Sequence, residues 1–195
     1  MTSISRQSQS GYADQFAFCD NALKSFETIP DNNHVKHKTI SIRKGAKKIN
    51  ISIIMDPITQ TALSYIYRTQ FRGVEHIIIG HAISIRTDTI FNKIIQPLYN
   101  EIFNTHDTRL IYRNLGKIVW YLSPIAALDG GSAATSLMFI YEIMNRKNLP
   151  LRRIDSDISL DLLAIFQPDV DKFSHDFEPL MSKSTTNSCQ YNLHQ

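Results

Sequence analysis

The sequence contains few of the residues that build covalent or metal-held frameworks. Only two of its 195 residues are cysteine, and these two, Cys19 and Cys189, lie near opposite ends of the chain. Neither a disulfide scaffold nor a cysteine metal cluster is therefore expected, and a reducing compartment is the default expectation.

Long apolar runs are also absent. The uninterrupted ones, such as Ile77–Ile79, fall far short of the roughly 20 residues that a membrane-spanning helix requires. The N-terminal sequence MTSISRQSQSGYADQ has no apolar stretch behind its arginine, so a secretory signal peptide is not expected. We predict no membrane span, a single domain over residues 12–181, and flexible tails at 1–11 and 182–195.

Carboxylates are missing from one basic segment. The net charge of +3 is too small to indicate nucleic-acid binding by the whole chain. Between Val35 and Met55, however, there are six Lys or Arg and no Asp or Glu. Isoleucines alternate with polar residues on both sides of RKGAKK, which predicts a β-hairpin over residues 38–53.

The basic residues of this hairpin admit two interpretations. Lysines on exposed strand edges protect a sheet against edge-to-edge aggregation. They also form a positive surface for an acidic partner, or for a strand that the partner adds to the sheet. The candidate partner-binding residues are Arg43, Lys44, Lys47 and Lys48.

Elsewhere apolar residues recur mostly at helical spacing, so the expected fold class is mainly α with one β-hairpin. The segment 73–87 is open between a short strand and a buried helix. Helices are expected over residues 12–26, 61–71, 88–103, 108–122, 133–146 and 156–166.

The loop SPIAALDGGSAATS, which begins at Ser123, poses the main functional question. Backbone N–H groups at the start of the following helix are placed to bind an anion. Alternatively, Asp129 or Ser132 caps the helix while the glycines turn a corner. A P-loop is excluded by its spacing and by the absence of Lys and Arg between Lys117 and Arg146. A dinucleotide fingerprint is excluded because the loop follows a helix.

Together, the hairpin and the loop resemble those of Fic/Doc-type proteins. In that family a β-hairpin flap precedes two antiparallel helices that are joined by the pattern HPFxxGNGRxxR. Here KTISIRKGAKKINIS resembles the flap, and SPIAALDGGSAATSLMFIYEIMNRKNLPL resembles the motif with its helix. The resemblance covers roughly Lys38 to Ile154. It implies a Fic-like helical bundle in a protein of the bacterial cytoplasm, or in an effector secreted into a host cell without a signal peptide.

The motif departs from the family at the positions that carry its chemistry. Ser123 stands where the family has its catalytic His, and Gly131 and Ala134 stand where it has two arginines. A serine has no pKa near neutrality, and without the arginines the phosphate contacts are lost. Transfer of AMP by the family's mechanism is therefore not expected. Asp129 replaces the family's Asn and is a candidate ligand for Mg²⁺.

We predict a degenerate Fic-like protein that acts mainly by binding a protein partner through its basic hairpin, as an effector or a toxin-associated regulator. A residual nucleotide or anion site, with Mg²⁺, is expected at Asp129, Gly130, Gly131 and Ser132.

Two enzymatic alternatives remain open. One is a nucleotide- or phosphate-transferring enzyme with a rebuilt site, in which His81 or His106 supplies the base. The other is a hydrolase built on Cys19 with His76 or His81, although a buried thiol on the first helix is the commoner situation. The sequence SHDFE at Ser174–Glu178 has the spacing of an inhibitory Fic helix, but we interpret it as helix capping.

Overall fold

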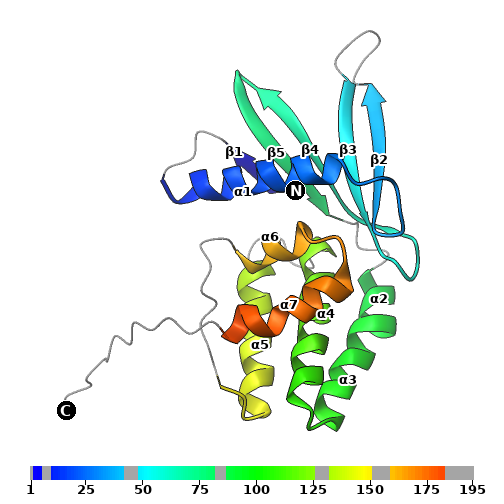
Figure 1. Cartoon of the computed structure of the whole chain (residues 1–195), viewed down its shortest axis with the longest axis vertical. Coiled ribbons are helices and arrows are strands. Elements are labelled where there is room, and N and C mark those ends of the chain that lie inside the picture. Colours follow the sequence, from blue (N-terminus) through cyan, green and yellow to red (C-terminus); the bar gives the residue numbers. More distant parts are fainter. Residues whose placement is uncertain are drawn as a thin grey trace, which may run out of the picture.

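The computed structural model describes residues 2–5, 10–41, 48–81, 87–125, 132–150 and 159–182. These residues form an antiparallel sheet beside a group of helices, and helix α1 lies across the sheet (Figure 1). The sheet has five strands in the order β1-β5-β4-β3-β2. Their bounds are β1 Thr2–Ser5, β2 Val35–Ser41, β3 Lys48–Met55, β4 Ala62–Phe71 and β5 Val74–His81. The prediction of a mainly α, Fic-like helical bundle is therefore wrong, and the fold is mixed α and β.

The predicted hairpin is confirmed as a pair of antiparallel strands. Val35 of β2 lies opposite Ile54 of β3, and Ser41 lies opposite Lys48 at the far end. The hairpin is not an isolated flap, because β3 also pairs with β4. Residues 42–47, which include Arg43, Lys44 and Lys47, lie outside the described residues.

The helix expected over residues 61–71 is strand β4, and this error accounts for the wrong fold class. Leu63, Ile66, Tyr67 and Phe71 do recur at helical spacing, but the segment is rich in aromatic and β-branched residues, which favour strands. In the fold, β4 pairs with β3 on one side and with β5 on the other. Pairing on both sides overrides the local pattern, so residues 62–81 supply two strands of the sheet.

Strand β5 settles the segment that sequence reasoning left open. It joins β4 through Arg72 and Gly73, whose φ angles are +50° and +79°. Phe71 and Val74 pair directly across this two-residue turn. Two consecutive positive φ angles match the right-handed twist of the flanking strands, which makes this a tight hairpin.

Helix α1 (Ser10–Glu27) confirms the first predicted helix and covers one face of the sheet, which we call the inner face. Its Phe16, Leu23 and Phe26 are buried in the same core as the sheet isoleucines Ile66 and Ile79. Inner-face residues thus alternate along each strand with residues that point the other way. An ion pair between Asp20 of α1 and Arg68 of β4 borders this interface.

The remaining helices pack around α4 (Thr108–Ile125), which contacts four other helices and the sheet through β4. Twelve of its residues, Tyr121 and Trp120 among them, are buried. It continues through Pro124, past the predicted end near Ser123. The other helical segments are α2 Thr87–Ile90, η2 Phe91–Ile95, α3 Gln96–Asn104, α5 Ser132–Arg146, α6 Leu160–Ile165 and α7 Val170–Ser182.

The structure also bears on the expected N-terminal tail, on the SHDFE sequence and on membrane-spanning helices. Residues 2–5, expected in a flexible tail, form the edge strand β1 beside β5. Ser174 lies inside α7 and donates to the Asp171 carbonyl oxygen at 2.8 Å, so the SHDFE sequence does not cap a helix start. Among the helices that the structure describes, none is long and apolar enough to cross a membrane.

Candidate functional site

The loop that begins at Ser123 is described only at its two ends. Ser123 is buried inside α4, where its hydroxyl donates to the Val119 carbonyl oxygen at 2.8 Å. Asp129, Gly130 and Gly131 lie outside the described residues, and Ser132 is the first residue of α5. Ser123 thus makes an ordinary bond within its helix. The nucleotide, anion and Mg²⁺ site at this loop stays a prediction.

Of the two histidines considered as bases, only His81 lies near this loop. Its Nδ1 donates to the Pro124 carbonyl oxygen at 3.1 Å. Burial lowers the pKa of His81, opposed by the Pro124 carbonyl and by the Asp161 carboxylate. His106 lies before the other end of α4, whose 18 residues span roughly 27 Å. The structure therefore separates His106 from the loop.

The thiol of Cys19 has the properties of a core residue. It is fully buried, and burial raises its pKa to about 12, with the Asp161 carboxylate adding to the shift. His76 and His81 are five residues apart on β5, so the strand's two-residue period places them on opposite faces. His81 alone shares the inner face with Cys19. A thiol that stays protonated at neutral pH is a poor nucleophile, which disfavours the hydrolase.

The sheet face opposite α1 is lined by two rows of side chains that run across the strands. One row is Lys36, Ile53 and Tyr65, followed by Gly80. The second row, two residues along each strand, is Lys38, Ile51, Tyr67 and Ile78. We call the seven side chains of these two rows the outer sheet face; Gly80 has no side chain and is not counted. They are Lys36, Lys38, Ile51, Ile53, Tyr65, Tyr67 and Ile78. Each row thus places a cation at one edge, followed by an aliphatic and then an aromatic side chain.

This face is accessible at its centre. Tyr65 is 36% exposed, and Ile51, Ile53 and Tyr67 are only partly buried. The rings of Tyr65 and Tyr67 are nearly parallel, at 16°, with centroids 6.4 Å apart. A Cβ at Gly80 would lie 1.9 Å from Cζ of Tyr65, so the tyrosine ring occupies the space above the glycine. The two rings and the isoleucines form a continuous apolar surface.

The charge on this face has one sign. Lys36 and Lys38 are exposed on β2, and neither forms an ion pair with a described residue. Among the residues of β2–β5 on this face, none is Asp or Glu, since Glu75 lies on the inner face opposite Gln70. Lys48 at the far end of the hairpin is also exposed, but its register with Ser41 places it on the opposite face, together with Ile54. The face is therefore apolar at its centre and cationic along β2.

The free edge of β2 is partly capped by the chain itself. The N–H of Val35 donates to Oδ1 of Asn32 at 2.9 Å, and the N–H of His37 donates to Oδ1 of Asp31 at 2.9 Å. These side chains block strand addition at the start of β2. The backbone N–H groups of Thr39 and Ser41 point away from β3 in the same way, and no described residue caps them, so they can pair with a partner strand.

Compared with protein-family models, with curated proteins and with solved structures, the chain gives no match in any of the three. The resemblance to Fic/Doc-type proteins is therefore not tested by relatives and stays a prediction.

Sequence reasoning does not identify this surface. Lys36 and Lys38 belong to the basic segment but are not among the predicted partner-binding residues, and Tyr65 and Tyr67 fall in the helix expected over residues 61–71. The signal that identifies the two tyrosines is the alternation in SYIYRTQF, where the aromatic or β-branched residues Tyr65, Tyr67, Thr69 and Phe71 occupy every second position.

Proposed function

We propose that this protein is a binding module whose outer sheet face docks an acidic, partly apolar segment of a partner protein. One observation carries the proposal: two rows of side chains place lysines beside isoleucines and tyrosines on a face without carboxylates among the described residues of β2–β5. Apolar contact supplies the affinity of such a site, and charge complementarity supplies its specificity and orientation.

The aliphatic content of the face favours a protein partner over a nucleic acid. Sheets that bind single-stranded RNA present aromatic rings on which bases stack. Here Ile51 and Ile53 lie between the lysines and the tyrosines of the two rows, and Ile78 lies on the other side of Tyr67. The small net charge of +3 supports the same choice, because phosphate binding draws on many cations.

The hairpin extends this surface. Thr39 and Ser41 offer backbone groups to an extended segment, and Lys48 adds a cation at the same end. Arg43, Lys44 and Lys47, which lie outside the described residues, belong to the proposal as further cations in the sequence between β2 and β3. An extended acidic segment alongside β2 then places its carboxylates near lysines and its apolar side chains over the isoleucines. A role as an effector or a toxin-associated regulator is compatible with docking of this kind.

Selection of peptides from a random library on the immobilised protein tests the proposal. We expect the enriched peptides to combine several Asp or Glu with aliphatic or aromatic residues. We also expect enrichment to fall on the variant Lys36→Glu with Lys38→Glu. Neutral or basic consensus peptides, or equal enrichment on wild type and variant, would contradict the proposal. Stronger binding of single-stranded RNA than of any peptide would contradict it as well.

A phosphate- or nucleotide-transferring role is the second candidate. It rests on His81, whose Nδ1–H donates to the carbonyl oxygen of Pro124 at the end of α4, next to the predicted nucleotide loop in the sequence. Calorimetry with ATP, ADP and GTP in the presence of Mg²⁺ tests it. Binding that is lost in Asp129→Ala would support this role, and no heat with any of the three nucleotides would remove it.

A further inference from the structure

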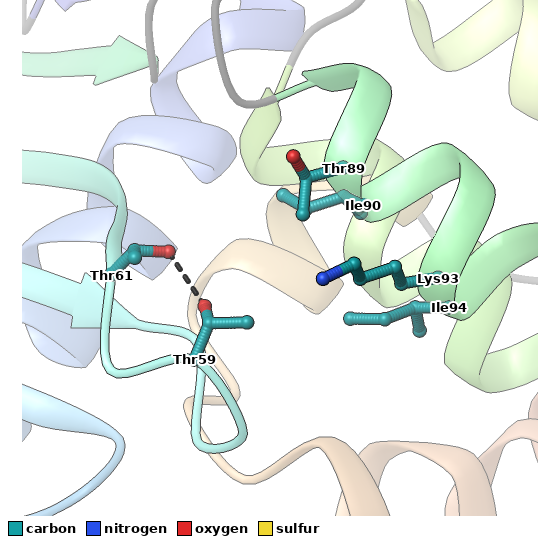
Figure 2. Close-up of a pocket in the computed structure, with 6 residues that line it drawn as sticks. All are labelled: Thr59, Thr61, Thr89, Ile90, Lys93 and Ile94. Carbon is teal, nitrogen blue, oxygen red and sulfur yellow. Dashed lines mark hydrogen bonds between the residues drawn. The ribbon is translucent and has the colours of Figure 1, made fainter.

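A cavity of about 250 Å³ lies between the turn that joins β3 to β4 and the first helical turns after β5. Thr59 and Thr61 line one wall. Thr89, Ile90, Lys93 and Ile94 line the other. Figure 2 shows the Lys93 side chain extending across the opening toward the two threonines. None of these lining residues belongs to the outer sheet face.

The carboxylate of Asp56 fixes the turn that forms the first wall. Asp56 is fully buried, and its Oδ1 accepts the Ile58 N–H at 3.0 Å and the Tyr121 hydroxyl at 3.3 Å. Its Oδ2 accepts the Thr59 hydroxyl, and its own N–H donates to the Thr61 carbonyl oxygen at 2.8 Å. A negative charge therefore lies directly behind the threonine wall.

The hydrogen-bond directions on this wall follow from the carboxylate. A carboxylate accepts only, so the proton of Thr59 points to Asp56. The hydroxyl oxygens of Thr59 and Thr61 are 2.8 Å apart, and Thr61 must then donate to Thr59. Both protons are committed, so Thr61 offers its oxygen lone pairs to the cavity. A ligand has to bring a donor to this wall.

The opposite wall of the cavity carries a positive charge on Lys93 and can therefore bind an anionic group. The Lys93 ammonium has three donors, and no described carboxylate lies within ion-pair distance of it. Ile90 and Ile94 beside it are 3% and 9% exposed, which gives this wall an apolar surface. One cation without an arginine suits a single negative charge, and the charge of Asp56 behind the other wall opposes a dianion such as phosphate.

We propose that this cavity binds the zwitterion of a free α-amino acid with an aliphatic side chain. Its carboxylate pairs with Lys93, and its ammonium donates to the oxygen of Thr61 in the field of Asp56. Its side chain lies against Ile90 and Ile94, and Thr89 offers a hydroxyl to either charged group. An amino acid satisfies both walls at once, whereas a simple carboxylic acid or amine satisfies only one.

Saturation-transfer NMR and calorimetry with leucine at millimolar concentration test this inference. We expect leucine to bind. We expect 4-methylpentanoate, which lacks the ammonium, and 3-methylbutylamine, which lacks the carboxylate, to bind roughly tenfold more weakly or worse. Inorganic phosphate serves as the dianionic probe. Absence of leucine binding, or tighter binding of phosphate, would overturn the inference.

Two variants assign the charged contacts separately. Lys93→Met keeps the length of the side chain, and we expect it to weaken leucine binding roughly tenfold while leaving 3-methylbutylamine unaffected. Thr61→Val keeps the shape of the wall, and we expect it to weaken leucine and the amine alike. Lys172→Met, on the exposed side of α7, is the matched control and should bind leucine as wild type does. Leucine binding that survives Lys93→Met would place the ligand elsewhere.

Discussion

The ring of Tyr65 covers the Cα of Gly80, its cross-strand neighbour on β5. The space that a side chain at position 80 would fill is already occupied by Cζ, Cε2 and the hydroxyl oxygen of the tyrosine. The absence of a side chain at position 80 therefore allows the Tyr65 ring to lie flat on the outer sheet face. The exposure of the Tyr65 ring at the proposed docking surface, and the orientation of that ring, both depend on the glycine at position 80.

Replacing Gly80 tests whether the position of the Tyr65 ring contributes to the affinity for the docked peptide. In Gly80→Ala the new Cβ displaces the far end of the Tyr65 side chain, which can move without shifting the backbone. We expect the variant to fold, with near-UV circular dichroism altered at its tyrosine bands, and to lose affinity for the selected acidic peptides. Gly73→Asn is the control, because no atom lies within 4 Å of a Cβ built at position 73, and Asn tolerates positive φ. Unchanged peptide affinity in Gly80→Ala would show that the ring's position is not used.

Gly116 permits the close approach of α4 and α7. A Cβ at position 116 would lie 2.8 Å from Cβ of Phe177 and 2.9 Å from Cα of Ser174. Since one of these atoms belongs to the backbone, Gly116→Ala should lower the free energy of unfolding by about 1–3 kcal/mol. Urea denaturation measures this change. Arg113→Ala on the exposed side of the same helix should alter it by less than about 0.5 kcal/mol.

Cys19 should make the protein less stable at alkaline pH. Its pKa is raised from 9.0 to about 12 in the folded state, so the unfolded chain loses the thiol proton first as the pH rises above 9. The folded state then binds more protons, and stability falls between pH 9 and 12. We expect Cys19→Ala to show a flatter pH dependence of its urea midpoint in this range. The native thiol should also resist alkylation at pH 8, and rapid alkylation would contradict its burial.

His81 should make the folded protein less stable as the pH falls into the acid range. Burial lowers its folded-state pKa below 6.5, so the unfolded chain binds the proton first as the pH falls. The contribution of His81 is complete above pH 6.5 and declines as the pH falls below it. Ring-proton NMR titration should show His81 with a midpoint below pH 6.5. A midpoint at or above pH 6.5 would show that the ring is solvated.

Sequence reasoning recovered the elements whose stabilisation is local. The helix at α1 and the hairpin of β2 with β3 carry clear periodicity, and both are confirmed. Strand β4 carries two periodicities at once, because Leu63, Ile66, Tyr67 and Phe71 have helical spacing while Tyr65, Tyr67 and Phe71 fit the alternation of a strand. Only the partners β3 and β5 decide between them, and pairing across the sheet cannot be read from one segment.

The candidate sites show the same limit. The basic residues near the hairpin are visible as a run of lysines, but their relation to the tyrosines depends on register across three strands. The cavity at Lys93 joins Thr59 and Thr61 to a helix about thirty residues later in the chain. No spacing rule connects these residues, because a long-range contact brings them together.

The affinity of one selected acidic peptide for three forms of the protein tests the central claim most directly. Fluorescence anisotropy would compare wild type, Lys36→Glu with Lys38→Glu, and the control pair Arg113→Glu with Lys172→Glu, two exposed cations on α4 and α7. The account predicts that reversing Lys36 and Lys38 weakens binding roughly tenfold, and that added salt weakens binding to wild type. The control pair should bind as tightly as wild type. Equal affinity of all three forms would contradict docking on the outer sheet face.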